Sequence, residues 1–236
     1  MSTLLLRLAG PLQAWGSESK FEVRRTGREP TKSGVIGLLA SALGCRRDDI
    51  DTVEKLDSLR MGIRIDQPGE LLRDYQIVHT EKRDAPYVTE RFYLSDAVFL
   101  VGLESDDVQL LSKLEGALRN PAFPLFLGRR SCPPTLPLVL GIRSLSLGGA
   151  LEKEPWQATE WRRKKLDGRL RIIEEGVLED GVTYRLRDRP LSFNPTHRQY
   201  GFVFWTERRG IDMKSNTGHD AISELMGGDD DVSQQD

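Results

Sequence analysis

The stretch Pro30–Gly44, PTKSGVIGLLASALG, decides the fold because it encodes a helix that must lie inside the protein. From residue 35 onward its positions are small or apolar on nearly every side, and a helix that is apolar all round is buried. Gly44 is a natural stop, because glycine readily adopts the left-handed conformation that ends many helices. The neighbouring segments are therefore expected to pack around this helix.

Strands are predicted on both sides of this helix. Residues 4–8 and 59–65 alternate between apolar and other side chains, which is typical of half-buried strands. The continuous apolar run at 97–103 predicts a buried strand, and a further strand lies within 138–145. A second helix is capped by Ser105 or Asp106 and ends at Asn120. This order predicts an α+β protein with a ferredoxin-like (RRM-like) βαββαβ fold.

Three parts of the chain follow from this pattern. Residues 1–147 are expected to form the ferredoxin-like domain, interrupted by a polar and aromatic excursion over about 71–94. Residues 148–210 are expected to form a smaller β-rich C-terminal part, with strands near 169–173, 182–186 and 201–206. Residues 211–236 are acidic and poor in apolar anchors, so we expect a disordered tail.

Composition narrows the class of protein. The 236 residues are 38% hydrophobic and 30% charged, which fits a soluble globular chain, and no apolar run approaches the roughly 20 residues of a membrane span. Two cysteines without metal-ligand spacing indicate a reducing cytoplasm. The net charge of −2 hides an asymmetry, because seven acids and one lysine at 211–236 leave residues 1–210 at +4. A mildly basic body permits a nucleic-acid partner.

The segment that leads into the buried helix is the first candidate site. Lys32 and Ser33 stand at a helix start, where backbone N–H groups and the helix dipole favour an anion. The P-loop pattern fails, because Thr26 and Thr31 replace its two glycines. The alternative is that Ser33 only caps the helix and that Lys32 is solvated. Binding of a polyanion is favoured by the cations between residues 20 and 32, which are Lys20, Arg24, Arg25, Arg28 and Lys32, against only Glu22 and Glu29.

Other stretches carry weaker signals of the same kind. FLGRRSCPP (126–134) places Arg129 and Arg130 in a turn suited to phosphate, although an isolated pair is more often solvated. GPLQAWG (10–16) presents Gln13 and Trp15, and the tryptophan either stacks on a base or packs in the core. The excursion mixes arginines with aromatic residues, as RNA-binding segments and protein-binding hairpins both do. The run EWRRKKLDGRLR (160–171) is a second basic patch or a solvated face.

No set of residues typical of catalysis stands out. The three histidines, His79, His197 and His219, are scattered, and no paired carboxylates, Ser-His-Asp set or metal cluster is evident. Cys132 is expected to be packed rather than reactive. The sequence therefore favours binding over catalysis, with no catalytic residue, metal or cofactor.

Several of these stretches also resemble a known family, the RAMP-superfamily CasD subunits of the type I-E CRISPR surveillance complex, Cascade. The likeness covers about the first 145 residues and is weaker afterwards, apart from QYGFVFWTERRG near the end. The stretches, in matching order, are LLRLAGPLQAWG, TGREPTKSGVIGLLASALGCRRDD, RDYQIV, ERFYLSDAVFLVGL, FLGRRSCPP and LPLVLG.

This resemblance implies a RAMP domain with a thumb-like excursion and a non-catalytic role in antiviral defence. Such a subunit binds the five-prime handle of the CRISPR RNA (crRNA) beside the large subunit and a backbone subunit, and meets target DNA only indirectly. By position, the residues expected to contact RNA are Gln13, Trp15, Arg24, Arg25, Arg28, Lys32, Ser33, Arg91, Arg129, Arg130 and Ser131. Two alternatives remain open: a metal-independent endoribonuclease using His79 and Tyr75, and a subunit that binds only proteins.

Overall fold

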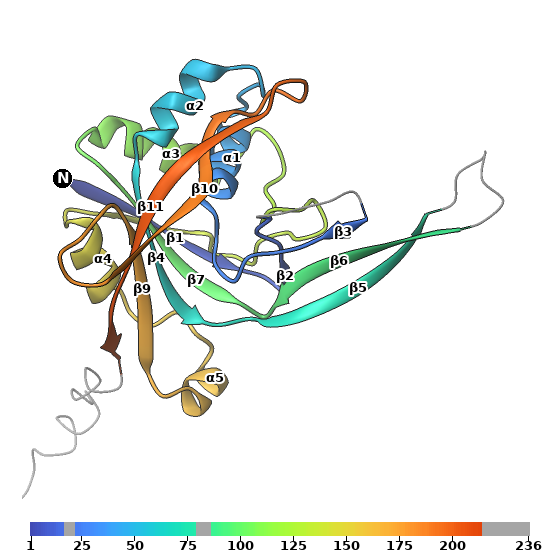
Figure 1. Ribbon diagram of the computed structural model, residues 1–236. Helices are drawn as coiled ribbons and strands as arrows, with labels where there is room; N and C mark the ends of the chain where they lie inside the picture. The colour runs from blue at the N-terminus through green and yellow to red at the C-terminus, as the bar shows by residue number, and fades with distance from the viewer. Residues whose placement is uncertain (17–21, 79–85, 214–236) are drawn as a thin grey trace, which may run out of the picture.

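The computed structural model describes residues 1–16, 22–78 and 86–213 (Figure 1). Its centre is a seven-stranded antiparallel sheet in the order β10-β11-β9-β4-β7-β1-β8. The α+β class predicted from the sequence is confirmed. The strands are β1 (Ser2–Ala9), β4 (Arg60–Gln67), β7 (Val98–Ser105), β8 (Val139–Arg143), β9 (Arg169–Glu175), β10 (Val182–Ser192) and β11 (Gln199–Asp212).

A second sheet holds the excursion that the sequence predicted at about 71–94. Strands β5 (Glu70–Val78) and β6 (Tyr87–Ser95) pair antiparallel and project from the body as a long hairpin (Figure 1). Two short strands, β2 (Leu12–Gln13) and β3 (Val23–Arg24), pair with β6 near the base of the hairpin. The hairpin is thus anchored to the loops that follow β1.

Helices lie on both faces of the large sheet. One face is covered by α1 (Lys32–Leu43), α2 (Ile50–Asp57) and α3 (Val108–Arg119), whose apolar residues join Leu4, Leu6 and Leu8 in the main core. On the other face, α4 (Leu147–Lys153) packs against Leu5 and its neighbours. A short helix, α5 (Glu160–Lys165), follows. No helix in the described ranges is long and apolar enough to cross a membrane.

The first predicted helix is buried as its sequence required. Val35, Ile36 and Leu39 of α1 are fully buried, and Gly44 ends the helix in the left-handed conformation, with φ of 75°. Its N-cap is Thr31, whose hydroxyl accepts a hydrogen bond from the Gly34 amide. The cap of α3 is Asp107, one or two residues beyond the predicted Ser105 or Asp106.

Two features of the C-terminal strands go beyond the sequence-based prediction. β9, β11 and β10 extend the same sheet beyond β4, so residues 148–210 add to the sheet already formed by residues 1–147. Strand β11 continues to Asp212, two residues into the expected tail, because Ile211 and Asp212 pair with β9. Met213 is also described and buried, and residues 214–236 of that tail lie outside the described residues.

Candidate nucleic-acid interface

The start of α1 already holds an anion from within the protein. The Lys32 amide donates to Asp188 Oδ2 at 2.5 Å, and the Ser33 hydroxyl donates to the same carboxylate. Burial raises the pKa of Asp188, while hydrogen bonds from Ser33 and Lys32 oppose that shift. The carboxylate of β10 therefore occupies the position where the sequence predicted an RNA phosphate.

Lys32 is also committed to internal partners. Its side chain is buried, and Nζ lies 2.6 Å from Glu175 Oε1 and 3.3 Å from Asp57 Oδ1. The expectation that Lys32 and Ser33 contact phosphate does not fit these contacts, because both side chains point at carboxylates of the protein. Lys32 instead ties α1 to α2 and β9.

Gln13 and Trp15 are buried rather than presented to a base. The indole N–H of Trp15 donates to Gln13 Oε1 at 3.0 Å, and the Gln13 amide donates to the carbonyls of Leu8 and Ala97. Both side chains are closed off from solvent. Of the two interpretations of Trp15, core packing fits this placement, and the pair fixes the shape of the loop after β1.

Arg129 joins three segments that carry residues expected to contact RNA. Its guanidinium donates to the Phe92 carbonyl at 3.0 Å and to the Arg24 carbonyl at 2.8 Å. It also lies 4.7 Å from the centre of the Tyr93 ring, a cation–π distance. One side chain thus connects the turn at 128–132 with β3 and with the base of the hairpin.

Gly128 brings the same turn against the loop after β1. Its φ is +85°, and a Cβ there would stand 1.7 Å from the Ala14 carbonyl oxygen. The Ala14 amide donates to the Leu127 carbonyl at 3.1 Å beside it. Glycine is needed here for both backbone conformation and space.

Arg91 lies where this cluster meets the hairpin. In the parallel pairing of β3 with β6, Arg24 stands opposite Arg91. Arg91 is half-buried, and its Nε is a buried donor without a hydrogen-bond partner among the described residues. A buried donor left in this state costs free energy, which an acceptor from a ligand would recover.

The remaining predicted cations are exposed. Arg24, Arg25, Arg28 and Arg130 face solvent, as does Ser131. Within the part of the chain that the structure describes, none of these four guanidinium groups forms a salt bridge. Together with Arg91 and Arg129 they form what we call the loop cluster, a group of cations on the loops around β2, β3 and the 128–132 turn.

A shallow hollow of about 190 Å³ lies beside the loop cluster. It is smaller than the roughly 300–1,000 Å³ of a typical small-molecule site. Its wall includes Phe193, Arg198 and Tyr200, which the sequence analysis did not assign to the site. A sequence feature that could have indicated Arg198 and Tyr200 is the basic and aromatic stretch HRQYGF at the start of β11. The other lining residues are Ala14, Trp15, Gly16, Thr31, Ser33, Gly34 and Gly128.

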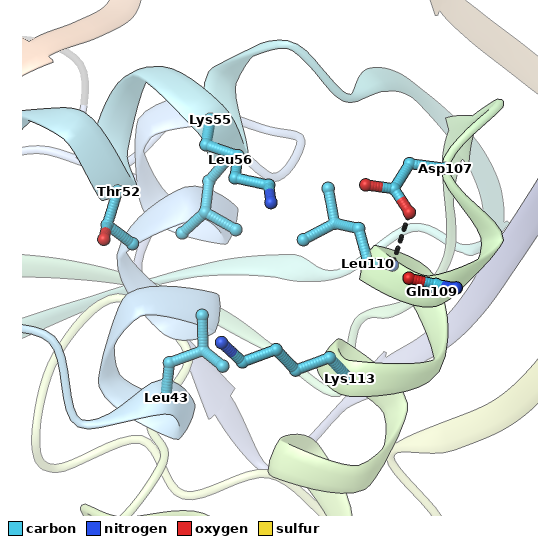
Figure 2. Close-up of a pocket in the computed structure, with 8 residues that line it drawn as sticks. All are labelled: Leu43, Thr52, Lys55, Leu56, Asp107, Gln109, Leu110 and Lys113. Carbon is cyan, nitrogen blue, oxygen red and sulfur yellow. Dashed lines mark hydrogen bonds between the residues drawn. The ribbon is translucent and has the colours of Figure 1, made fainter.

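A larger hollow of about 240 Å³ lies elsewhere, between α2, α3 and the end of α1 (Figure 2). Leu43, Leu56 and Leu110 form its apolar part, and the side chains of Lys55 and Lys113 reach across it. It shares no lining residue with the loop cluster. Its size alone does not make it the functional site, because it offers two lysines, Lys55 and Lys113, whereas the loop cluster gathers six arginines.

The residues considered for catalysis or metal binding are placed as follows. No group of three or more His, Cys, Asp or Glu within these ranges could hold a metal ion. His79 lies outside the described residues, while Tyr75 is exposed on β5 and His197 contacts Gln199 in the β10–β11 turn. Cys132 is buried, as predicted, and burial raises the pKa of its thiol.

The fold and the loop cluster define a class: an α+β protein with a projecting hairpin and unpaired arginines suited to a polyanion. The chain belongs to the CRISPR-associated protein Cas5 family, whose family model matches residues 3–205. It is 40% identical over 227 residues to the CRISPR system Cascade subunit CasD of Escherichia coli strain K12, covering 89% of this chain and 96% of the relative.

Solved structures agree with this assignment. A chain of a CRISPR RNA-guided surveillance complex aligns with a TM-score of 0.74 at 29% identity, over 90% of this chain and 92% of that chain. A structure described as a Cas protein aligns with a TM-score of 0.66 at 38% identity, over 89% of this chain and 95% of that chain. The resemblance noted in the sequence is confirmed.

Proposed function

We propose that this chain is the CasD subunit of a Cascade surveillance complex and that its loop cluster binds the five-prime handle of the crRNA. The single observation that carries the proposal is that Arg129 ties the 128–132 turn and β3, which both bear exposed arginines without ion-pair partners, to the base of the hairpin, where Arg91 lies. Surface arginines without carboxylate partners are available to phosphate, which they bind with two parallel hydrogen bonds. The identity with a Cascade subunit supports the same role.

The proposed contacts divide among the residues by exposure. Arg24, Arg25, Arg28 and Arg130 would meet phosphates directly, with Ser131 as a further donor. Arg91, with its unpartnered Nε, would bind where the handle passes the base of the hairpin. Gln13, Trp15, Lys32 and Ser33 would act indirectly, by fixing the loops that carry the arginines.

The finer description of the fold is part of the same proposal. The order β8-β1-β7-β4, with helices after β1 and β7, supports a ferredoxin-like βαββαβ domain. The β5–β6 hairpin would be its thumb, and β9 to β11 its C-terminal β-rich part.

We assign the subunit a non-catalytic role in a cytoplasmic ribonucleoprotein that defends against viruses. The large subunit and a backbone subunit would be its protein neighbours, and target DNA would be engaged through the crRNA. The identity with a Cascade subunit supports this assignment. The endoribonuclease alternative gains no support from the position of Tyr75, which lies on the exposed hairpin.

The test is to replace Arg25 and Arg130 by glutamine and to measure handle RNA binding across a salt series. Each lost phosphate contact lowers the log–log salt slope by about 0.7 for a single strand, so the double variant should lose about 1.4. Arg47→Gln with Lys113→Gln is the control, because both cations are exposed, form no salt bridge with the described residues and lie outside the loop cluster.

A wild-type salt slope and wild-type yield of assembled complex in the Arg25 and Arg130 variant would refute the proposal. Arg129 is left intact, because its hydrogen bonds hold the loops together. If it were replaced, a loss of RNA affinity could come from displaced loops rather than from a lost phosphate contact.

A further inference from the structure

Strand β11 carries a residue pattern that the loop cluster does not use. Residues 198–205 read RQYGFVFW. This matches the RNA-binding pattern K/R-G-F/Y-G/A-F-V-x-F/Y except at Gln199 and Trp205. In that pattern the outward-facing aromatic residues of a strand stack on bases of single-stranded RNA. A match in sequence has meaning only if the aromatic side chains face solvent.

The strand does separate its residues in this way. Val203 and Trp205 are buried in the main core, at 4% and 2% exposure. Phe202 and Phe204 are 52% and 47% exposed. Successive side chains of a strand point to opposite faces, so the two phenylalanines share the outer face. Two phenylalanine rings side by side in water cost free energy, and such an exposed apolar patch indicates a binding surface.

Cations accompany these rings. The Arg185 guanidinium of β10 lies 4.3 Å from the centre of the Phe202 ring, and Arg185 stands opposite Phe204 in the strand register. Arg187, two residues further along β10, is exposed, and its Nε donates to the Tyr200 carbonyl. Aromatic rings interleaved with arginine are typical of surfaces that bind single-stranded nucleic acid.

The start of β11 connects this face to the loop cluster. Arg198 and Tyr200 line the 190 Å³ hollow together with Gly16 and Gly128. By the alternation of the strand, Tyr200 lies on the same face as Phe202 and Phe204. A strand of RNA leaving the loop cluster through the hollow would therefore meet these rings in succession.

We propose that the outer face of β10 and β11 is a base-stacking platform for single-stranded RNA, formed by Tyr200, Phe202 and Phe204 with Arg185 and Arg187. The inference rests on the proposed function, since it needs RNA at the loop cluster. RNA is favoured over a protein partner because cations lie against the rings and because the platform continues from the hollow.

The test uses the full chain with Phe202→Leu and Phe204→Leu, which keep an apolar side chain but remove the ring. The probe is a single-stranded CRISPR repeat RNA carrying 2-aminopurine at one position at a time, whose fluorescence falls when the base stacks. We expect the double variant to bind about five- to a hundredfold more weakly and to restore fluorescence at one or two positions. Val182→Ala is the control, because Val182 is an exposed apolar residue of β10 outside the pattern.

The outcomes separate this inference from the proposed function. Unchanged affinity and quenching in the folded double variant would overturn the platform, and the Arg25 and Arg130 variant would still test the loop cluster by itself. Loss of a protein subunit from the assembled complex, with RNA affinity unchanged, would also overturn it and identify the face as a protein interface. Circular dichroism and urea unfolding establish that each variant is folded.

Discussion

At the scale of single residues, a lysine and a serine at a helix start serve folding here. The helix dipole and its free N–H groups attract an anion wherever it comes from. In this protein the anion is Asp188, from a strand some 155 residues later in the sequence. Sequence reasoning identified the preference correctly but could not identify its source, because the partner becomes adjacent only in the folded chain.

Replacing Lys32 by methionine should therefore destabilise the protein. The change removes the cation that Asp57 and Glu175 share and leaves Asp57 paired only with Arg189. We therefore expect a loss of about 3 kcal/mol, the lower end of the cost of breaking a buried pair. Urea unfolding monitored by tryptophan fluorescence measures the change in the free energy of unfolding.

Arg28→Met is the matched control, since Arg28 is an exposed cation four residues earlier. Its stability should stay within about 0.5 kcal/mol of wild type, while its RNA affinity falls. Wild-type stability with weakened RNA binding in Lys32→Met would show that Lys32 contacts RNA after all.

At the scale of elements, the turn at 128–132 gives three adjacent residues three different tasks. Gly128 allows close contact with the loop after β1, Arg129 bonds to β3 and β6, and Arg130 remains exposed. The sequence predicted the same role for both arginines. Their difference arises from carbonyl groups of distant segments, which no local pattern reveals.

Gly128→Ala should displace this turn. A methyl group 1.7 Å from a carbonyl oxygen cannot be accommodated, so the turn must move away from Ala14 and the RNA affinity should fall together with stability. Gly176→Ala is the control, because Gly176 also has positive φ, +114°, but no atom lies within 4 Å of its new methyl group.

The control should lose only about 1–3 kcal/mol of stability, the cost of the backbone strain that alanine introduces, and should keep its RNA affinity. Thermal unfolding and handle RNA titration of both variants make the comparison. Equal RNA affinity in the two variants would contradict the assigned role of the Gly128 contact.

The strands and helices themselves were largely predictable, and the reasons are local. The alternation in β1 and β4 and the apolar run in β7 correspond to strands within a few residues of the predicted bounds. The short helices α2, α4 and α5 were missed. Helix α4 begins with Leu-Gly-Gly and α5 buries no residue, whereas α2 does carry apolar residues at helical spacing after its cap Asp49 and was overlooked. The burial of Gln13 and Trp15 was not predicted, because the glycines on either side of them indicate an exposed loop. The segment instead folds back into the core.

At the scale of the whole molecule, the projecting hairpin carries more apolar surface than a free protein tolerates easily. Ile77 and Val88 stand opposite each other in the β5–β6 register, at 62% and 51% exposure. Leu71, Leu72 and Tyr75 of β5 are also exposed. A two-stranded ribbon of this kind needs a covering partner or associates with its own copies.

Ile77→Thr combined with Val88→Thr should reduce self-association of the purified chain. Threonine retains strand preference, so the hairpin should persist while its apolar surface shrinks. Light scattering at matched concentrations measures the effect, with Val177→Thr as the control at an exposed loop position. Unaltered scattering in the double variant would show that the chain does not self-associate through the hairpin.

The sheet order also governs how the chain matures on the ribosome. When β8 has been synthesised, β4 still lacks its neighbour β9 and α1 still lacks its carboxylate at Asp188. At about 5–20 residues per second, roughly two to nine seconds pass before that aspartate is made. During that interval the nascent chain exposes an open strand edge, which is prone to pair with other chains. A slow codon before residue 188 would lengthen this exposure, and a premature stop there would release a fragment that aggregates.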